Sequence, residues 1–154
     1  MIKYLSGMKD FMLNPKEYST TGNQEIDGVL NYMLQKANKT LNQVDVQINI
    51  PEDLYFNNFN ICVILGNLVD NAVREASKSK EKLLTIKMQI KQEVLLIFIE
   101  NSYSGKILEK RNGLQTTQPE LAIHGIGLEN VKKVVIANGG EIKIDYTSNR
   151  FCVQ

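Results

Sequence analysis

The chain is organised around a predicted helix that has two different faces, Ile64-Leu65-Gly66-Asn67-Leu68-Val69-Asp70-Asn71-Ala72-Val73-Arg74-Glu75-Ala76. At about 100° per residue, one narrow strip of this helix is polar and another is apolar. The polar strip holds Asn67, Asn71, Arg74 and Lys78, and the apolar strip holds Ile61, Leu65, Leu68, Ala72 and Ala76. Asparagine is a poor helix former because its amide competes for backbone groups, so this pair indicates either a solvated surface or a binding face.

The composition is that of an ordinary soluble domain. The chain has 154 residues, of which 43% are hydrophobic and 23% charged, enough for one domain with a buried core. The formal net charge is only +1, so we expect no nucleic-acid partner. Cys62 and Cys152 lack zinc-ligand spacing, which favours a reducing, cytoplasmic setting. We see no signal-peptide core and no apolar run that could cross a bilayer, so we expect no membrane contact by this chain.

The N-terminal half predicts a helix, a strand and the central helix. Residues 1–13 form an amphipathic piece, and a turn-rich linker follows up to residue 22. A helix is expected from about residue 26 to 41, because its apolar residues form one stripe. Apolar and polar residues then alternate over residues 44–50, as in a half-buried strand. An Asn-rich stretch, residues 57–60, can cap the central helix, which should end near Ser77.

The C-terminal half predicts four strands and one more helix. A one-sided strand is expected at residues 84–90, and residues 94–99 are apolar throughout and should form the most buried strand, after a turn at 91–93. Residues 103–123 form a long polar segment typical of a lid. His124-Gly125-Ile126-Gly127-Leu128 should be a turn that opens a helix, which ends at Asn138-Gly139-Gly140. Short strands should cover residues 142–146 and begin again at 151, with a turn at Ser148-Asn149.

These elements predict the fold class. Strands with one apolar face and helices with one apolar stripe assemble as an α/β fold, here a two-layer α/β sandwich in which a mixed β-sheet carries helices on one face. A doubly wound parallel sheet would need strands that are apolar on both faces.

Two motifs outside the central helix have more than one interpretation when taken singly. A glycine-rich turn at residues 124–127 can present backbone N–H groups and a helix dipole to phosphate, although such glycines are often simple turn residues. Asn101 follows the apolar strand, and its amide can pair with the edge of a base or merely form a turn.

Together, the motifs resemble the ATP-binding Bergerat fold of the GHKL superfamily. Asn67-Leu68-Val69-Asp70-Asn71-Ala72 is similar to its N box, and Asn101-Ser102-Tyr103-Ser104-Gly105 to a degenerate first glycine box. His124-Gly125-Ile126-Gly127-Leu128 is similar to the second glycine box. Within the superfamily, the chain resembles the catalytic domains of Gram-positive sensor histidine kinases of the peptide-pheromone-sensing type, over roughly residues 23–154.

The resemblance implies ATP and Mg²⁺ as cofactors and assigns roles to individual residues. Asn71 corresponds to the asparagine whose amide oxygen binds Mg²⁺. Asn101 corresponds to the acidic residue that reads the adenine amino group, and its carbonyl can still accept that hydrogen bond. Arg74 lies within reach of phosphate oxygens. The remaining expected nucleotide-binding residues are Asn67, Gly105, which begins the lid, and His124, Gly125, Ile126, Gly127 and Leu128 of the second glycine box.

Two departures from the family pattern bear on mechanism. Tyr103 stands where most families have glycine, which leaves the lid conformation open. Asn67 stands where hydrolytic members carry a glutamate that activates water, and an amide cannot act as that base. We therefore expect the chain to bind ATP so that a histidine can attack it, and not to hydrolyse ATP rapidly.

That acceptor histidine is expected outside this chain, because the only histidine, His124, lies in the phosphate-binding motif. The resemblance implies that residues 1–22 are the remnant of the preceding helical dimerisation region and linker, and that residues 23–154 are the catalytic domain. The expected partners are ATP, the histidine-bearing dimerisation helices of the parent kinase and a response regulator. The parent would be a membrane-bound sensor with this domain in the cytoplasm.

Two other functions remain open from the sequence. One is a GHKL-type protein serine kinase or anti-sigma-like regulator, which would be expected to carry a glutamate in place of Asn67. The other is a nucleotide-independent interaction domain that keeps the fold and has lost the chemistry. Retention of Asn71, Gly125 and Gly127 argues against the second.

Overall fold

A computed structural model describes residues 19–104 and 119–154, and for residues 119–127 it describes the backbone. The amphipathic piece expected at residues 1–13 and most of the expected lid lie outside the described residues. Within these residues, three helices and five strands form two layers. The helices are α2 (Gln24–Thr40), α3 (Asn58–Lys78) and α5 (Pro119–Ala137). The strands are β1 (Gln43–Asn49), β2 (Leu83–Lys91), β3 (Val94–Ser102), β4 (Ile144–Tyr146) and β5 (Arg150–Val153).

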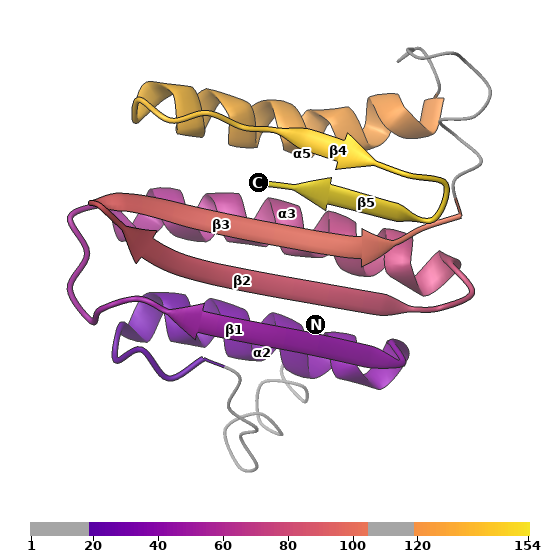
Figure 1. The fold of residues 1–154 in the computed structure, drawn as a ribbon, viewed down its shortest axis with the longest axis horizontal. Coiled ribbons are helices and arrows are strands. Elements are labelled where there is room, and N and C mark those ends of the chain that lie inside the picture. Colours follow the sequence, from indigo (N-terminus) through magenta and orange to yellow (C-terminus); the bar gives the residue numbers. More distant parts are fainter. Residues whose placement is uncertain (1–18, 105–118) are drawn as a thin grey trace, which may run out of the picture.

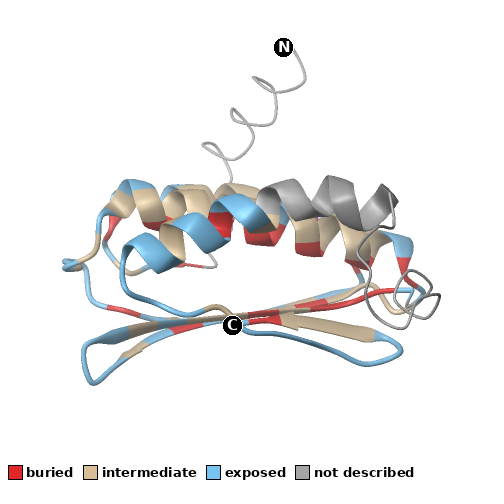
Figure 2. Cartoon of the chain, turned by 90° about the horizontal axis from the view of Figure 1, so that it is seen from above, coloured by how far each residue is buried: buried red, intermediate tan, exposed pale blue. Residues whose placement is uncertain are grey.

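The strands form one mixed sheet in the order β1-β2-β3-β5-β4. β1 is parallel to β2, and the other neighbouring strands are antiparallel. All three helices cover one face of this sheet, as Figure 2 shows. The predicted α/β fold class, a two-layer sandwich with a mixed sheet and helices on one face, is confirmed.

Local sequence explains where several elements begin and turn. Asn57 caps α3 by accepting a hydrogen bond from the backbone N–H of Asn60, as the Asn-rich stretch predicted. The turn between β2 and β3 places Gln92 and Glu93 at positive φ, +52° and +65°, which suits a two-residue hairpin turn. Gly139, with φ +75°, follows the end of α5, and this confirms the predicted glycine stop.

The central helix of the layer is α3, which packs against α2 on one side and α5 on the other (Figure 1). Its apolar strip is buried as predicted, and Leu65, Val69 and Ala76 are fully shielded from solvent. Beneath it lie Leu84, Ile86 and Ile99 of strands β2 and β3. The polar strip of α3 is therefore held by a helix that packs against two others and against the sheet.

The prediction that residues 94–99 form the most buried strand is wrong. Val94 and Leu96 are 53% and 41% exposed, whereas β2 buries Leu84, Ile86 and Met88 almost completely. The reason is the one-sided helix layer: alternate residues of β3 point away from the helices, and nothing in the described chain covers that face.

The expected turn at residues 124–127 is also different. α5 begins at Pro119, so this glycine-containing stretch lies inside the helix and not ahead of it. Proline suits the first position of a helix, because its fixed φ is already helical and its missing N–H is not needed there.

Candidate functional site

The polar strip of α3 contains Asn67, Asn71 and Arg74, and their side chains are in different states. The Asn67 Nδ2 group donates to the Val63 carbonyl one turn earlier, at 2.9 Å. The Asn71 side chain is half-buried and has no hydrogen-bond partner among the described atoms, which do not include the side chains of residues 119–127. An amide on a packed helix that is not bound by the described residues is available to a ligand.

Arg74 pairs with Asp70, one turn earlier on the same helix. Both side chains are open to solvent, with 40% of Arg74 and 63% of Asp70 exposed. An exposed ion pair of this kind is weak, because water competes for both charges. The guanidinium can therefore exchange its carboxylate partner for a phosphate oxygen at little cost.

Asn101 lies near the end of β3 and is almost completely buried, with 3% of its surface exposed. It is two residues beyond Ile99 and thus on the same, helix-facing side of the strand. Its Nδ2 group donates to the carbonyl oxygen of Ser102 at 2.9 Å. The amide carbonyl of Asn101 accepts no bond from the described residues, so an acceptor is left for a ligand.

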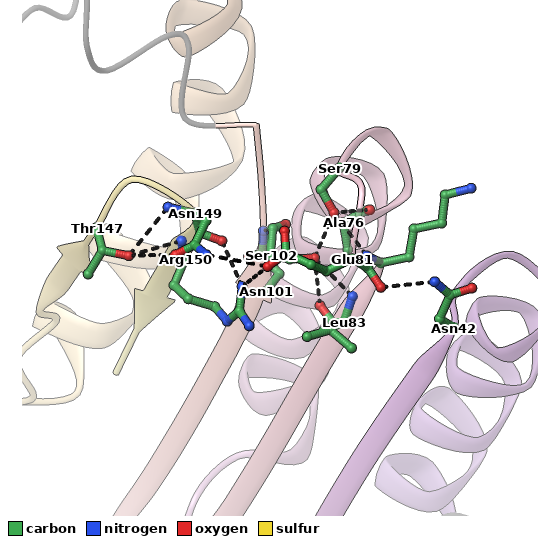
Figure 3. Close-up of polar contacts among 11 residues, drawn as sticks. Asn42, Ala76, Ser79, Glu81, Leu83, Asn101, Ser102, Thr147, Asn149 and Arg150 are labelled. Atoms are coloured by element: carbon green, nitrogen blue, oxygen red, sulfur yellow. Dashed lines mark hydrogen bonds and ion pairs between the residues drawn. The ribbon is translucent and has the colours of Figure 1, made fainter.

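Buried hydroxyls connect this strand end to the end of α3 (Figure 3). The Ser79 hydroxyl donates to the Ala76 carbonyl at 2.7 Å and lies 2.7 Å from the Ser102 hydroxyl. The backbone N–H of Leu83 donates to the Ser102 hydroxyl at 2.9 Å. We call Ser79 and Ser102 the serine pair. It links the helix that carries Asn71 to the strand that carries Asn101.

Tyr103, which departs from the family glycine, is anchored to the turn between β4 and β5. Its hydroxyl donates to the Thr147 carbonyl at 2.5 Å, and its backbone N–H donates to the Asn149 carbonyl at 3.2 Å. Its ring also meets the Phe151 ring edge-on, with centroids 6.0 Å apart. The tyrosine therefore holds the start of the lid segment in place.

The same hairpin turn is connected to the segment between α3 and β2. Arg150 forms a 2.7 Å ion pair with Glu81, and both side chains are about one-third exposed. Figure 3 shows these residues on three converging segments, at the ends of α3, β3 and the β4–β5 hairpin. The strand end that carries Asn101 is thus braced from both sides.

The remaining predicted site residues are placed only in part. Gly105 lies outside the described residues, and residues 124–127 are described by their backbone, which is helical. Leu128 is half-buried and packs against the core, as expected. Sequence reasoning missed the serine pair and the anchoring of Tyr103, because a lone serine or tyrosine carries no pattern that identifies its distant partner.

The described part of the chain also bears on other kinds of site. Within it, no three His, Cys, Asp or Glu side chains gather where they could hold a metal ion. None of its helices has the length and apolarity needed to span a membrane. Burial, with the nearby charge of Glu25 and Glu100 respectively, raises the pKa of Cys62 and of Cys152, so neither thiol is activated as a nucleophile.

Residues 56–154 match the sequence model of the GHKL domain. This region contains all three motif boxes and most of the chain. The chain therefore belongs to the GHKL domain family. No curated protein matches it by sequence.

Solved structures with the same fold include histidine kinases. The Acinetobacter baumannii histidine kinase AdeS is 17% identical, with a TM-score of 0.57, over 99% of this chain and 74% of that one. The nucleotide-free catalytic domain of the histidine kinase ThkA is 19% identical, with a TM-score of 0.56, over 87% and 92% of the two chains. Full-length ShkA in complex with AMPPNP is 15% identical, with a TM-score of 0.56, over 85% and 29%. At these identities the likeness establishes the fold.

Proposed function

We propose that this chain is the ATP-binding catalytic domain of a two-component sensor histidine kinase, which binds Mg-ATP and transfers the γ-phosphoryl group to a histidine outside the chain. The observation that carries the proposal is the pair of asparagines in the family boxes. Asn71 presents a free amide on the central helix, and Asn101 presents a free carbonyl at a braced strand end. These are the two oxygen acceptors that a nucleotide and its metal require.

The residues present fit Mg²⁺. This ion prefers oxygen ligands and is often held by one or two protein groups together with substrate phosphates. The Asn71 amide oxygen would supply such a ligand, and nothing in the described chain competes for it. When bound, Mg²⁺ would neutralise negative charge on the phosphates.

The base and the phosphates would be read by different elements. The Asn101 carbonyl would accept from the exocyclic amino group of adenine, in a buried position that excludes water. Arg74 would leave Asp70 to contact a phosphate. Gly125 and Gly127 remain predicted phosphate contacts, because a glycine lets the backbone approach a ligand closely. His124 and Ile126 remain predictions with them.

Asn67 favours transfer to a protein side chain over hydrolysis. An amide cannot take a proton from water, and its Nδ2 group is already bound to Val63. A neutral imidazole needs no such base, since its nitrogen has a free electron pair. That nitrogen would attack the γ-phosphorus as the bond to the bridging oxygen of the β-phosphate breaks, which leaves ADP.

The wider setting of the chain is part of the proposal. The acceptor would lie on the dimerisation helices of the parent kinase, with a response regulator downstream, and residues 1–22 would be the end of that helical region and its linker. The parent would be a membrane-bound sensor of the peptide-pheromone type, with this domain in the cytoplasm. The neighbour ShkA, solved in complex with AMPPNP, has the same fold, and this supports nucleotide binding by the chain.

Calorimetric titration with a non-hydrolysable ATP analogue, with and without Mg²⁺, tests the proposal. We expect Mg²⁺-dependent binding by the chain, and a loss of about 100-fold or more in Asn71→Ala, because the protein ligand to the metal is removed. Asn38→Ala is the matched control, since Asn38 is an exposed asparagine on α2. Its affinity should equal that of the wild type.

The outcome that contradicts the proposal is equally clear. If the folded wild type binds no nucleotide at millimolar concentration, the kinase function fails for this chain. A nucleotide-independent interaction domain would then be the better account.

A further inference from the structure

Ser102 contacts Asn101 and α3 through two different atoms. Its carbonyl oxygen accepts from the Asn101 Nδ2 group at 2.9 Å. Its hydroxyl accepts from the Leu83 N–H at 2.9 Å and lies 2.7 Å from the Ser79 hydroxyl. Ser102 is fully buried, and Ser79 is 5% exposed. The backbone that orients the Asn101 amide is therefore itself held by buried hydrogen bonds.

Hydrogen bonds connect the serine pair to the end of α3. The Ser79 hydroxyl uses its hydrogen on the Ala76 carbonyl at the end of α3. It also accepts from the Lys82 N–H at 3.1 Å. With that hydrogen on Ala76, the Ser102 hydroxyl can donate to the Ser79 oxygen at 2.7 Å or to the Leu83 carbonyl at 3.4 Å, and the Ser79 contact is the shorter. The end of α3 orients the Ser79 hydroxyl, which holds Ser102 in place. The carbonyl of Ser102 in turn orients the amide of Asn101.

The orientation of that amide matters because its two ends are chemically opposite. With NH₂ bound to Ser102, the oxygen is left to accept. An acceptor there matches the amino group of adenine and opposes the carbonyl of guanine, since two facing acceptors repel and stay unpaired. If the amide could turn over, it could pair with either a hydrogen-bond donor or an acceptor on the base, and the site would not distinguish the two bases.

We propose that Ser102, held by Ser79, is a positioning residue that fixes the Asn101 amide and so determines the preference of the site for bases with an amino group at the adenine position. The proposal rests on the proposed function, because it assumes that Asn101 contacts the base. It assigns selectivity to two buried residues that act through Asn101.

The experiment compares Mg²⁺-dependent binding of four probes to the full chain. These are ATP, GTP, purine riboside triphosphate, which lacks the amino group, and inorganic tripolyphosphate, which lacks the base. For Ser102→Ala we expect ATP affinity to fall about 10-fold while tripolyphosphate affinity stays unchanged. The preference for ATP over purine riboside triphosphate should disappear. Ser79→Ala should lower the ATP affinity and the preference for ATP over purine riboside triphosphate in the same direction, by about 3-fold.

Ser77→Ala is the matched control. The Ser77 hydroxyl also bonds back to a helix carbonyl three residues earlier, that of Arg74 at 2.8 Å, but it has no bond to β3. We expect it to leave all four affinities unchanged. A role of the serines in helix stability alone would make Ser77→Ala and Ser79→Ala behave alike.

The outcomes separate this inference from the proposed function. If the wild type binds no ATP, both fail. If the wild type prefers ATP and the folded Ser102→Ala variant keeps that preference, only the inference fails. It also fails if tripolyphosphate affinity falls as much as ATP affinity, or if the wild type does not distinguish ATP from purine riboside triphosphate. Should Ser102→Ala not fold, Ser79→Ala decides by the same criteria.

Discussion

The middle of α3 and the end of β3 each present an asparagine from a family box, and the two are held in opposite ways. Asn71 is half-buried with its amide free, on a helix that is packed on both sides. Asn101 is buried, and its NH₂ group is bound within a chain of hydrogen bonds that reaches back to α3. A metal ligand needs an oxygen without a competing partner, whereas a base reader needs a fixed orientation.

The difference in burial explains why the fold tolerates an unbound amide at Asn71 but binds the amide at Asn101. A half-buried amide is reached by water when no ligand is present, so leaving Asn71 unpaired costs little. A buried amide without partners would cost about 1 to 3 kcal/mol, so Asn101 has to be bound by the protein. The predictions below test whether the two regions act separately.

After the loss already expected from Asn71→Ala, the largest effect is expected from Asn101→Ala. ATP affinity should fall about 30-fold, or about 2 kcal/mol, because the adenine contact is lost and the Ser102 carbonyl is left without its donor. Tripolyphosphate affinity should not change, whereas Asn71→Ala should weaken both probes. Calorimetry with both probes measures this. Equal losses for the two probes in Asn101→Ala would show that the regions do not act separately.

A smaller effect is expected from Arg74→Ala on the same strip as Asn71. The loss of one cation near the phosphates should weaken ATP and tripolyphosphate by about 5-fold, and more at low salt because screening is weaker. Asp70→Ala is the control, since it removes the competing carboxylate from Arg74 and should leave affinity unchanged or slightly higher. Arg74 has no phosphate role if its removal and that of Asp70 shift affinity alike.

The smallest effect on binding is expected from Asp27→Asn, far from both regions. The Asp27 carboxylate accepts from the Ser19 hydroxyl at 2.6 Å, the Thr21 N–H at 3.1 Å and the Gly22 N–H at 3.0 Å. Burial alone would raise the pKa of this carboxyl, but those bonds outweigh it and the pKa lies below its ordinary value of 3.8. The substitution should cost about 1 kcal/mol of unfolding free energy at pH 7 and leave ATP affinity unchanged.

The lowered pKa also fixes the pH dependence of stability. A carboxyl whose pKa is lowered by folding contributes its full stabilisation above the unfolded value near 3.8 and loses it as pH falls toward the folded pKa. Thermal melts of the wild type should therefore fall more steeply below pH 4 than those of Asp27→Asn. If the melting temperatures of the wild type and of Asp27→Asn fell in parallel as pH is lowered, this role of Asp27 would be excluded. If Asp27→Asn changed ATP affinity, a loss of stability would be sufficient to alter the site.

Much of the fold followed from local pattern. The 3.6-residue period defined the apolar strip of α3, and the period of two defined β1 and β2, because each reports a single buried face. The error at Val94 and Leu96 has the same origin. An apolar residue on an uncovered sheet face cannot be told from a buried one by its identity, because hydrophobicity alone does not indicate which face the helices cover.

The sequence by itself determined the helix that presents Asn67, Asn71 and Arg74, the order of the motif boxes, and the layered α/β fold, since these depend on residues close together along the chain. Only the tertiary structure decided that no described residue binds the Asn71 amide, that the Asn101 amide is bound, and that Ser79 and Ser102 meet across 23 residues. Such contacts depend on where α3 and β3 end relative to each other, and that distance is set by packing of the whole core.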